Sequence, residues 1–298
     1  MREKPRGLLV PITTPFDPAT GDVAPVHLRD NARALLDRGV AGIVAAGSTG
    51  EASLLAESEF RQVVGWLRDV VPDDRWLIAG AGRESTRATI AACRAAAAEG
   101  ADGVLVRTPS YYGPVLTTAS LTDHFRQVAD ESPIPLVLYN FPRYTHVPIP
   151  EQIVAALARH ENVWGAKDSS GDLKNFAAFR EAAPEWALFI GPGAQYYPAL
   201  ELGAAGAVAA VACFAAALTV GIGEAFAAGE RARAGSLQEV VAPLHRTIVG
   251  ELGVPAIKAA MDAVGLFGGP PRAPIPTLGE RDRARVVDLL RGAGLVGS

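Results

Sequence analysis

The chain has 298 residues, a length that a single barrel domain of about 250 residues largely accounts for. Hydrophobic residues make up 49% of the chain and charged residues 20%, and the net charge of −4 carries no signature of a polyanion-binding surface, so nucleic acid is not an expected partner. No apolar run reaches the roughly 18 residues of a spanning helix, and none follows the charged segment Met1–Arg6, so we expect a cytoplasmic protein with no signal peptide and no membrane partner.

Short apolar segments recur along the chain and alternate with longer segments rich in Ala, Arg and Glu. Nearly continuous apolar segments are typical of strands that are buried on both faces of a parallel sheet. In chain order, the expected strands are Leu8–Ile12, Gly42–Ala46, Trp76–Ala79, Gly103–Val106, Leu136–Tyr139, Val163–Lys167, Leu188–Gly191 and Ala207–Val211. The expected helices are Val26–Arg38, Ser58–Val71, Thr86–Glu99, Ser120–Asp130, Pro150–Arg159, Leu173–Ala182, Gln195–Leu202 and Phe214–Ala228. Eight strand–helix steps close into a barrel, so the predicted fold class is α/β, a (β/α)₈ TIM barrel.

Three further helical patterns follow the eighth expected barrel helix, at Arg231–Leu252, Pro255–Val264 and Arg281–Leu295. A stretch rich in Gly and Pro, which begins at Gly268, separates the last two. We expect residues 1–228 to form the catalytic barrel domain. Residues 229–298 are expected to form a C-terminal three-helix appendage that packs on the barrel.

Neither the cysteines nor the histidines show the spacing of a metal site. The two cysteines, Cys93 and Cys213, are too few for a disulfide framework, and we expect both to be buried side chains in a reducing compartment. The histidines are scattered along the chain, at His27, His124, His146, His160 and His245. Only His146 is expected near the active site, and no metal is predicted.

Polar residues follow five of the expected strands, and barrel enzymes place their active sites at these strand ends. The five segments are Gly47–Glu51, Arg107–Gly113, Tyr139–Pro142, Lys167–Gly171 and Gly191–Gly193. All five loops open on the same rim of the barrel, so the sequence predicts the active site there.

Lys167 is the sharpest candidate, because it closes an apolar strand and would point into the barrel mouth. Low-dielectric walls would disfavour its ammonium form and leave a nucleophilic amine. A neutral amine can attack a ketone and form an iminium, which acts as an electron sink. The alternative is a structural lysine that reaches solvent or pairs with Asp168 or Asp172, and strand position alone does not decide between the two.

Two neighbouring features could serve the same chemistry. Tyr139 closes the adjacent strand, so its phenol could move protons at the mouth, although a half-buried structural tyrosine is the commoner case. The turn Gly47–Glu51 offers two hydroxyls and backbone N–H groups that could hold a carboxylate, or it is a plain strand-to-helix connection.

Four motifs resemble the dihydrodipicolinate synthase/N-acetylneuraminate lyase family, in order along nearly the whole chain: Pro11–Phe16, Gly47–Glu51, Tyr139–Pro142 and Gly165–Asp168. The resemblance implies a lyase, a Schiff-base-forming class I aldolase that acts on pyruvate and a small aldehyde or oxo acid. It also implies a homodimer or homotetramer, and no metal or organic cofactor.

The family's site residues can be carried over to matching positions of this chain. The resemblance implies that Lys167 forms the Schiff base, Tyr139 shuttles protons and Thr49 joins a hydroxyl relay. Tyr111 would complete that relay from the neighbouring subunit. The implied substrate-binding residues are Ser48, Thr49, Gly191, Val208, Arg143 and Ser169.

The segment after the fifth strand departs from the synthase pattern. The arginine that clamps the aldehyde's carboxylate in the synthases aligns with Tyr144, Arg143 stands one position early, and His146 replaces a glycine. Other stretches are more similar to 4-hydroxy-2-oxoglutarate aldolases, namely Ala79–Thr86, Thr108–Tyr112, Lys167–Asp172, Gly253–Lys258 and Gly268–Pro274.

Three hypotheses about function follow. The first is a pyruvate aldolase similar to 4-hydroxy-2-oxoglutarate aldolase, which cleaves its substrate to pyruvate and glyoxylate. The second is a 4-hydroxy-tetrahydrodipicolinate synthase, which condenses pyruvate with aspartate semialdehyde. The third, from another class, is a non-catalytic sensor of a 2-oxo acid or sugar acid, which would have no chemical need for Lys167, Tyr139 and Thr49 together.

Overall fold

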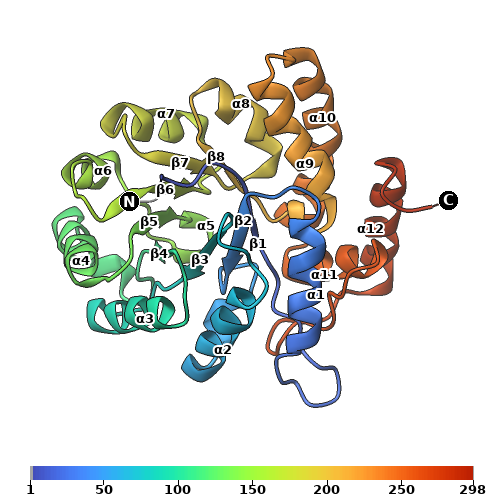
Figure 1. Cartoon of the computed structure of the whole chain (residues 1–298), viewed down its shortest axis with the longest axis horizontal. Coiled ribbons are helices and arrows are strands. Elements are labelled where there is room, and N and C mark those ends of the chain that lie inside the picture. The colour runs from blue at the N-terminus through green and yellow to red at the C-terminus, as the bar shows by residue number, and fades with distance from the viewer. Residues whose placement is uncertain (1–2, 298) are drawn as a thin grey trace.

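Eight parallel strands pair in chain order, and the first also pairs with the last, so that the sheet closes into a barrel (Figure 1). They are β1 (Gly7–Pro11), β2 (Gly42–Ala45), β3 (Trp76–Gly80), β4 (Gly103–Arg107), β5 (Leu136–Asn140), β6 (Val163–Asp168), β7 (Ala187–Ile190) and β8 (Gly206–Val208). This computed structural model describes residues 3–297; the first two residues of the predicted N-terminal segment and the last residue of the predicted appendage lie outside the described residues. The predicted TIM barrel is confirmed.

Helices follow the strands and surround the barrel (Figure 1). They are α1 (Pro25–Leu36), α2 (Glu57–Arg68), α3 (Thr86–Ala98), α4 (Thr118–Glu131), α6 (Glu151–Leu157), α7 (Leu173–Ala182), α8 (Tyr196–Glu201) and α9 (Ala212–Ala227). Ser85, Thr117 and Asp172 begin α3, α4 and α7, and each side chain accepts a bond from a backbone N–H of the first turn. Such caps satisfy donors that have no partner within the helix.

Four short turns that the sequence did not predict lie in the loops at the rim. They are the 3₁₀ turns η1 (Ala52–Leu54), η2 (Gly113–Val115) and η3 (Gly193–Gln195), and the short helix α5 (Pro142–Thr145). Each contains three or four residues, too few to produce a hydrophobic period that a sequence pattern could reveal.

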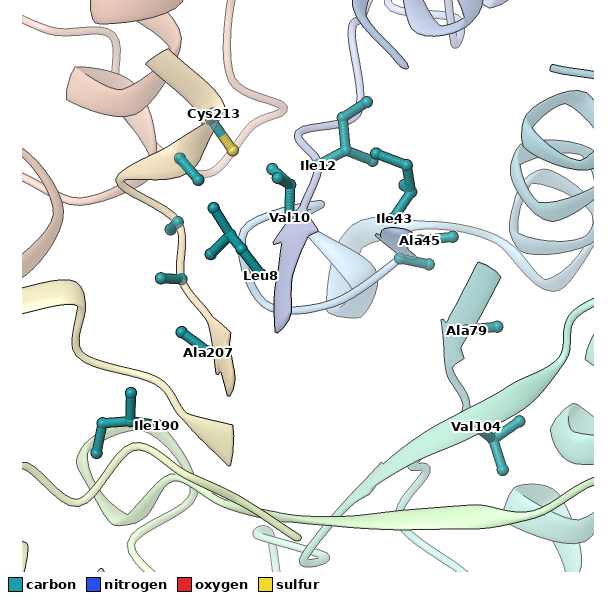
Figure 2. Close-up of a cluster of buried hydrophobic side chains, with 14 of the residues drawn as sticks. Leu8, Val10, Ile12, Ile43, Ala45, Ala79, Val104, Ile190, Ala207 and Cys213 are labelled. Carbon is teal, nitrogen blue, oxygen red and sulfur yellow. The ribbon is translucent and has the colours of Figure 1, made fainter. Parts of the chain in front are cut away.

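Alternate side chains of the strands point to opposite faces of the sheet, which divides the core into two parts. The inner part fills the barrel and includes Leu9, Val44, Ile78, Leu105, Val137 and Phe189. The outer part lies between strands and helices and includes Val10, Ile43, Ala79, Val104, Ile190 and Ala207 (Figure 2). Both cysteines are buried, as predicted, and Cys213 lies in this outer part. Because side chains fill the interior, we expect the ligand site at the carboxyl ends of the strands.

The C-terminal helices α10 (Arg231–Leu244), α11 (Val254–Ala263) and α12 (Glu280–Gly292) lie on one side of the barrel, beside α9 (Figure 1). Their buried side chains, among them Leu244, Ile257 and Leu290, belong to the same core as the outer faces of the strands. The three predicted C-terminal helices are therefore present. The division of the chain into domains at residue 228 stays a prediction.

One long helix expected at Arg231–Leu252 is instead two elements. After α10 the chain continues as a π-helical turn, η4 (His245–Glu251), in which the N–H of Leu252 bonds the carbonyl of Thr247, five residues back. Pro243 lies just before this turn and has no N–H to donate to a regular helix.

None of the helices in residues 3–297 combines the length and apolar character that a membrane crossing requires.

Candidate active site

Lys167 lies near the C-terminal end of β6 with only 5% of its surface exposed. Its side chain contributes to the wall of a cavity of about 600 Å³ at the end of the barrel, which we call the Lys167 cavity. Burial lowers the pKa of Lys167 to about 7, because an ammonium ion loses hydration there without gaining a counterion. A substantial share of the amine is therefore neutral and nucleophilic at neutral pH.

The neighbouring Asp168 does not neutralise Lys167, because successive residues of a strand point to opposite faces. Its carboxylate accepts hydrogen bonds from Asn140 Nδ2 (2.8 Å), Ser170 Oγ (2.9 Å) and Asn175 Nδ2 (3.2 Å). The carboxylate of Asp172 accepts from the N–H of Lys174 and begins α7. Lys167 therefore neither reaches solvent nor pairs with Asp168 or Asp172, so the structural alternative for this residue was wrong.

Tyr139 lies directly beside Lys167, because the two residues are register partners on β5 and β6. The Lys167 Nζ is 4.1 Å from the centre of the Tyr139 ring. Burial raises the pKa of Tyr139 to about 12, although the hydroxyls of Ser48 and Ser169 oppose this. The phenol is therefore protonated at neutral pH and can donate a proton next to the amine.

The turn Gly47–Glu51 follows β2 and has left-handed backbone on both sides, with φ of 46° at Ala46 and 57° at Glu51. The Thr14 hydroxyl donates to the Gly50 carbonyl at 2.7 Å. Gly80, at the end of β3, allows this tight approach, since a Cβ there would be 2.1 Å from the Ala46 carbonyl oxygen. The turn is thus held by its neighbours in a conformation that its own sequence disfavours.

The two hydroxyls of this turn are not equivalent. Ser48 Oγ is 3.4 Å from the Tyr139 hydroxyl, a long hydrogen bond. Thr49 is buried and lines the Lys167 cavity, but no hydrogen bond joins its hydroxyl to another described residue. Ser48, and not Thr49, is therefore the hydroxyl that is hydrogen-bonded to Tyr139.

Gly191, Val208 and Ser169, which the family resemblance implies as substrate-binding residues, also line the Lys167 cavity. Gly191 follows β7, and its N–H donates to the Asp168 carbonyl at 2.7 Å. A Cβ at Gly191 would be 1.9 Å from Ser169 Oγ, so only glycine allows Ser169 its position beside Tyr139. Val208 is buried on β8 and closes the apolar side.

The outer half of the Lys167 cavity has an aromatic wall and two unpaired cations. Phe141 stacks on Tyr139 with ring centres 5.6 Å apart, and Tyr144 lies 4.4 Å from Phe141. Arg143 and Arg246 line the same cavity, and neither guanidinium has an ion pair or hydrogen bond with another residue among positions 3–297. Glu251 is also present, but Arg285 holds its carboxylate through contacts of 2.6 and 2.8 Å. The cavity is therefore electropositive at its outer end.

The histidine at this cavity is His245, and the expectation for His146 was wrong. His146 is exposed, ends α5 with a left-handed φ of 56°, and is absent from the cavity wall. This conformation explains why a glycine suits the position. His245 Nδ1 accepts from the Gly193 N–H, and burial together with Arg246 and Arg143 lowers the His245 pKa to about 4, so the ring is neutral.

Sequence reasoning also missed Arg246 and Gln195. Gln195 donates to the Gly171 carbonyl, while its Oε1 is buried and has no partner among the described residues. Both side chains line the Lys167 cavity from elements, the π-helical turn and η3, that carry no periodic signal. The proline at position 243 was the one available sign that the helix departs from regular geometry there.

Tyr111 is not part of the cavity wall in this chain and is 79% exposed. It lies in the loop between β4 and η2, and its backbone N–H donates to the Glu84 carboxylate at 2.9 Å. Tyr112 and Val115 of the same loop are also exposed. Three large exposed apolar side chains in one loop are typical of a surface that another chain covers.

No group of three or more His, Cys, Asp or Glu side chains within residues 3–297 is arranged to hold a metal ion.

The fold and the cavity together define an enzyme of the TIM-barrel class, with an amine and a phenol at the catalytic end. The family model described as the dihydrodipicolinate synthetase family matches residues 4–293. The chain belongs to this family of lyases and synthases, and the family predicted from the sequence is confirmed.

Individual relatives match over nearly the whole chain. A 4-hydroxy-tetrahydrodipicolinate synthase of Methanoculleus marisnigri is 37% identical over 279 residues, which is 92% of this chain and 94% of the relative. An uncharacterised DapA-like lyase of Halobacterium salinarum is also 37% identical, over 97% of this chain and 94% of its own length. The dihydrodipicolinate synthase of Acinetobacter baumannii, solved in complex with pyruvate, superimposes with a TM-score of 0.93 at 30% identity, over 98% of this chain and all of the other.

Proposed function

We propose that the protein is a class I aldolase in which Lys167 forms a Schiff base with pyruvate. The observation that carries this proposal is the buried, unpaired Lys167 amine, with a pKa of about 7, beside the protonated phenol of Tyr139 at the wall of one cavity. The pyruvate complex of the Acinetobacter relative supports pyruvate as the keto acid.

The proposed reaction begins when the neutral Lys167 amine attacks the keto carbon of pyruvate. Tyr139 relays a proton from the amine nitrogen to the keto oxygen, which gives a neutral carbinolamine. It then protonates the carbinolamine hydroxyl, water leaves, and an iminium forms with Tyr139 as the phenolate. The phenolate takes a proton from the methyl carbon, which gives an enamine, and the enamine carbon attacks the aldehyde carbon of the second substrate. The aldehyde oxygen takes that proton from Tyr139. Water then adds to the iminium and gives a proton to the phenolate, and the resulting carbinolamine breaks down to release the product and the neutral Lys167 amine. Cleavage follows the same steps in reverse.

We assign the two hydroxyls of the Gly47–Glu51 turn on the basis of distance. Ser48 is the relay partner of Tyr139, because it is the hydroxyl within reach. Thr49, which faces the same cavity, binds the pyruvate carboxylate together with backbone N–H groups of the turn. This exchanges the roles that the family resemblance gave to Ser48 and Thr49.

The relay is completed by Tyr111 of a second subunit in a homodimer or homotetramer. The exposure of Tyr111, Tyr112 and Val115 in one loop supports a chain-to-chain contact at that point.

The second substrate carries a carboxylate, which Arg143 and Arg246 bind. The two guanidiniums are unpaired and line the outer end of the Lys167 cavity, and the neutral His245 can add a donor there. Glyoxylate and aspartate semialdehyde both meet this requirement, so cleavage of 4-hydroxy-2-oxoglutarate and synthesis of 4-hydroxy-tetrahydrodipicolinate are the two candidate reactions. Tyr144 at the aligned arginine position favours the first, and the names of the synthase relatives favour the second.

A substrate panel tests this proposal. Pyruvate release is measured from 4-hydroxy-2-oxoglutarate, and pyruvate consumption with aspartate semialdehyde, glyoxylate and an uncharged aldehyde of similar size. We expect turnover with a carboxylate-bearing partner, and a KM for that partner that rises about 10-fold or more in Arg246→Gln, since a bond to a charged group is lost. A preference for the uncharged aldehyde would refute the anionic second substrate, and binding without any turnover would favour the sensor hypothesis.

A further inference from the structure

A buried ion pair joins the active-site turn to the C-terminal helices. Lys258 on α11 and Glu51 at the end of the turn lie 2.6 Å apart, Nζ to Oε1, with side-chain exposures of 1% and 0%. Among the ion pairs of the described residues, the others are at least partly exposed to solvent. Water and salt screen those exposed pairs, whereas the buried Lys258–Glu51 pair is screened much less. The two side chains therefore stay in a fixed orientation.

Lys258 has a complete set of partners, which fixes its position. Besides Glu51, its ammonium group donates to the carbonyl of Thr14 at 2.9 Å and to that of Pro270 at 2.8 Å. It also lies over the Phe16 ring, 4.4 Å from its centre. One side chain thus connects the loop after β1, the turn after β2 and the segment after α11.

Glu51 is held on its other oxygen as well. The backbone N–H of Arg272 donates to Glu51 Oε2 at 2.8 Å. Glu51 has left-handed backbone and comes two residues after Thr49, so the direction of its side chain is coupled to the course of the turn. A non-glycine residue keeps such a conformation only where its surroundings impose it.

A buried ion pair is weak evidence for stability, because apolar side chains of similar volume often replace one without loss. This pair instead fixes the direction of the Glu51 side chain, at the end of the turn that presents Ser48 and Thr49 to the Lys167 cavity. The same C-terminal segment also lines the adjoining cavity of about 550 Å³, through Gly253, Val254 and Pro274.

We propose that Lys258 is a positioning residue for the reaction, which acts through Glu51 to hold the Gly47–Glu51 turn in its pyruvate-binding conformation. The C-terminal helices are then part of the catalytic apparatus. This inference rests on the proposed function, because it assigns the turn to pyruvate.

Arg272 provides a matched control. Its guanidinium binds Glu59 with contacts of 2.6 and 2.7 Å and also bonds the carbonyls of Leu54 and Gly21. Arg272→Met therefore removes an anchor of the same C-terminal segment. It leaves the Lys258–Glu51 pair and the backbone bond to Glu51 in place.

The experiment compares wild type, Lys258→Met and Arg272→Met at a temperature where circular dichroism shows all three folded. Borohydride traps the pyruvate adduct, and intact mass gives the trapped fraction as a function of pyruvate concentration. We expect the half-saturating pyruvate concentration to rise about 10-fold or more in Lys258→Met, because a misplaced turn loses carboxylate contacts. Arg272→Met keeps the wild-type value, even though its melting temperature falls.

Glu51→Gln serves as the second variant if Lys258→Met does not fold, since it keeps the shape and the acceptor for Arg272 but removes the ion pair. A folded variant of either kind with the wild-type half-saturating concentration would overturn the positioning role. Equal shifts in the Arg272 control would overturn it too, because they would indicate a general loosening. Absence of an adduct in wild type would instead refute the proposed function.

Discussion

The proposed chemistry depends on one residue, Lys167, whose buried environment disfavours its charged form. Lys167 is buried without a counterion, and the two acids nearest in sequence are bonded elsewhere. Desolvation of this kind makes an amine nucleophilic at neutral pH at some expense of stability. Perturbed pKa values of a buried lysine and a buried tyrosine on adjacent strands are the pattern expected of a catalytic pair.

The pKa of Lys167 predicts a pH dependence of adduct formation. The neutral amine is the reactive form, so its fraction rises with pH through the pKa of about 7 and levels off above it. The rate of pyruvate trapping at low pyruvate should therefore increase between about pH 5 and pH 8 and change little above that range. An inflection near the ordinary lysine pKa would show that the amine is not desolvated in the free enzyme.

Tyr139→Phe removes the proposed proton donor and keeps the ring that packs beside Lys167. Turnover should fall by roughly 10²–10⁴-fold, the usual contribution of a positioned acid–base group. Steady-state pyruvate release measures this, with circular dichroism as the control for folding. Turnover near the wild-type rate would remove Tyr139 from the mechanism.

Residue positions on strands were predictable from the sequence, while those on short turns were not. Lys167 and Tyr139 close apolar stretches, and the barrel rule then puts them at the catalytic end. The choice between Ser48 and Thr49 depends on the course of a turn with left-handed residues at both ends, which no periodic pattern encodes. Arg246 and His245 were missed because they stand on a π-helical turn that was expected to be regular helix.

At the scale of elements, specific polar contacts hold the loop that follows β4. Glu84 accepts hydrogen bonds from the N–H groups of Ser110 and Tyr111, from Ser110 Oγ and from Arg107. Partial burial raises the pKa of Glu84, but the hydrogen bonds from Tyr111, Ser110 and Arg107 outweigh this effect and lower the pKa to about 2. The carboxylate therefore stays ionised at physiological pH and fixes the loop that carries Tyr111.

Glu84→Gln should loosen that loop and lower turnover about 10-fold, because the proposed relay loses its fixed Tyr111. The half-saturating pyruvate concentration for adduct trapping should stay the same, since the turn that we propose binds pyruvate is untouched. Glu57→Gln is a suitable control, because it breaks the nearby exposed pair with Arg83 and leaves the loop alone. Equal turnover in the two variants would show that Glu84 has no role in positioning.

The strands and long helices follow from hydrophobic patterning, and the observed ends differ from the expected ones by a few residues at most, except for the helix expected at Arg231–Leu252, which ends at Leu244. β8 ends earlier than expected, at Val208, because the apolar run Ala209–Val211 continues as a helical turn into α9. Ala-rich apolar segments suit a buried helix as well as a buried strand, so their sequence does not set that boundary.

At the scale of the whole molecule, the proposed site is complete only when two chains associate. Tyr111 is exposed and does not line the Lys167 cavity of its own chain, and the proposed relay needs it from a partner. The C-terminal helices, in contrast, belong to the same chain as the cavity. They reach the site through Lys258 and through the side chains of the π-helical turn.

Mixed oligomers test the shared site. Lys167→Ala and Tyr111→Phe are each expected to have strongly reduced activity alone. The two variants are unfolded and refolded together. Each mixed dimer then contains one site that has an intact Lys167 and an intact Tyr111 from the partner. With random pairing in a symmetric dimer, about one site in four of the whole sample is intact. Activity should recover to about that fraction, measured as pyruvate release. No recovery above the sum of the two variants would refute the contribution of Tyr111 across the interface.

The most direct test of the central claim is reductive trapping. Wild-type protein is incubated with pyruvate and borohydride, the intact mass is measured, and peptide mapping locates the adduct. The account predicts a mass increase of one reduced pyruvate per chain, located on Lys167 and absent from Lys167→Ala. An unchanged mass, or an adduct on another lysine that persists in Lys167→Ala, would contradict it.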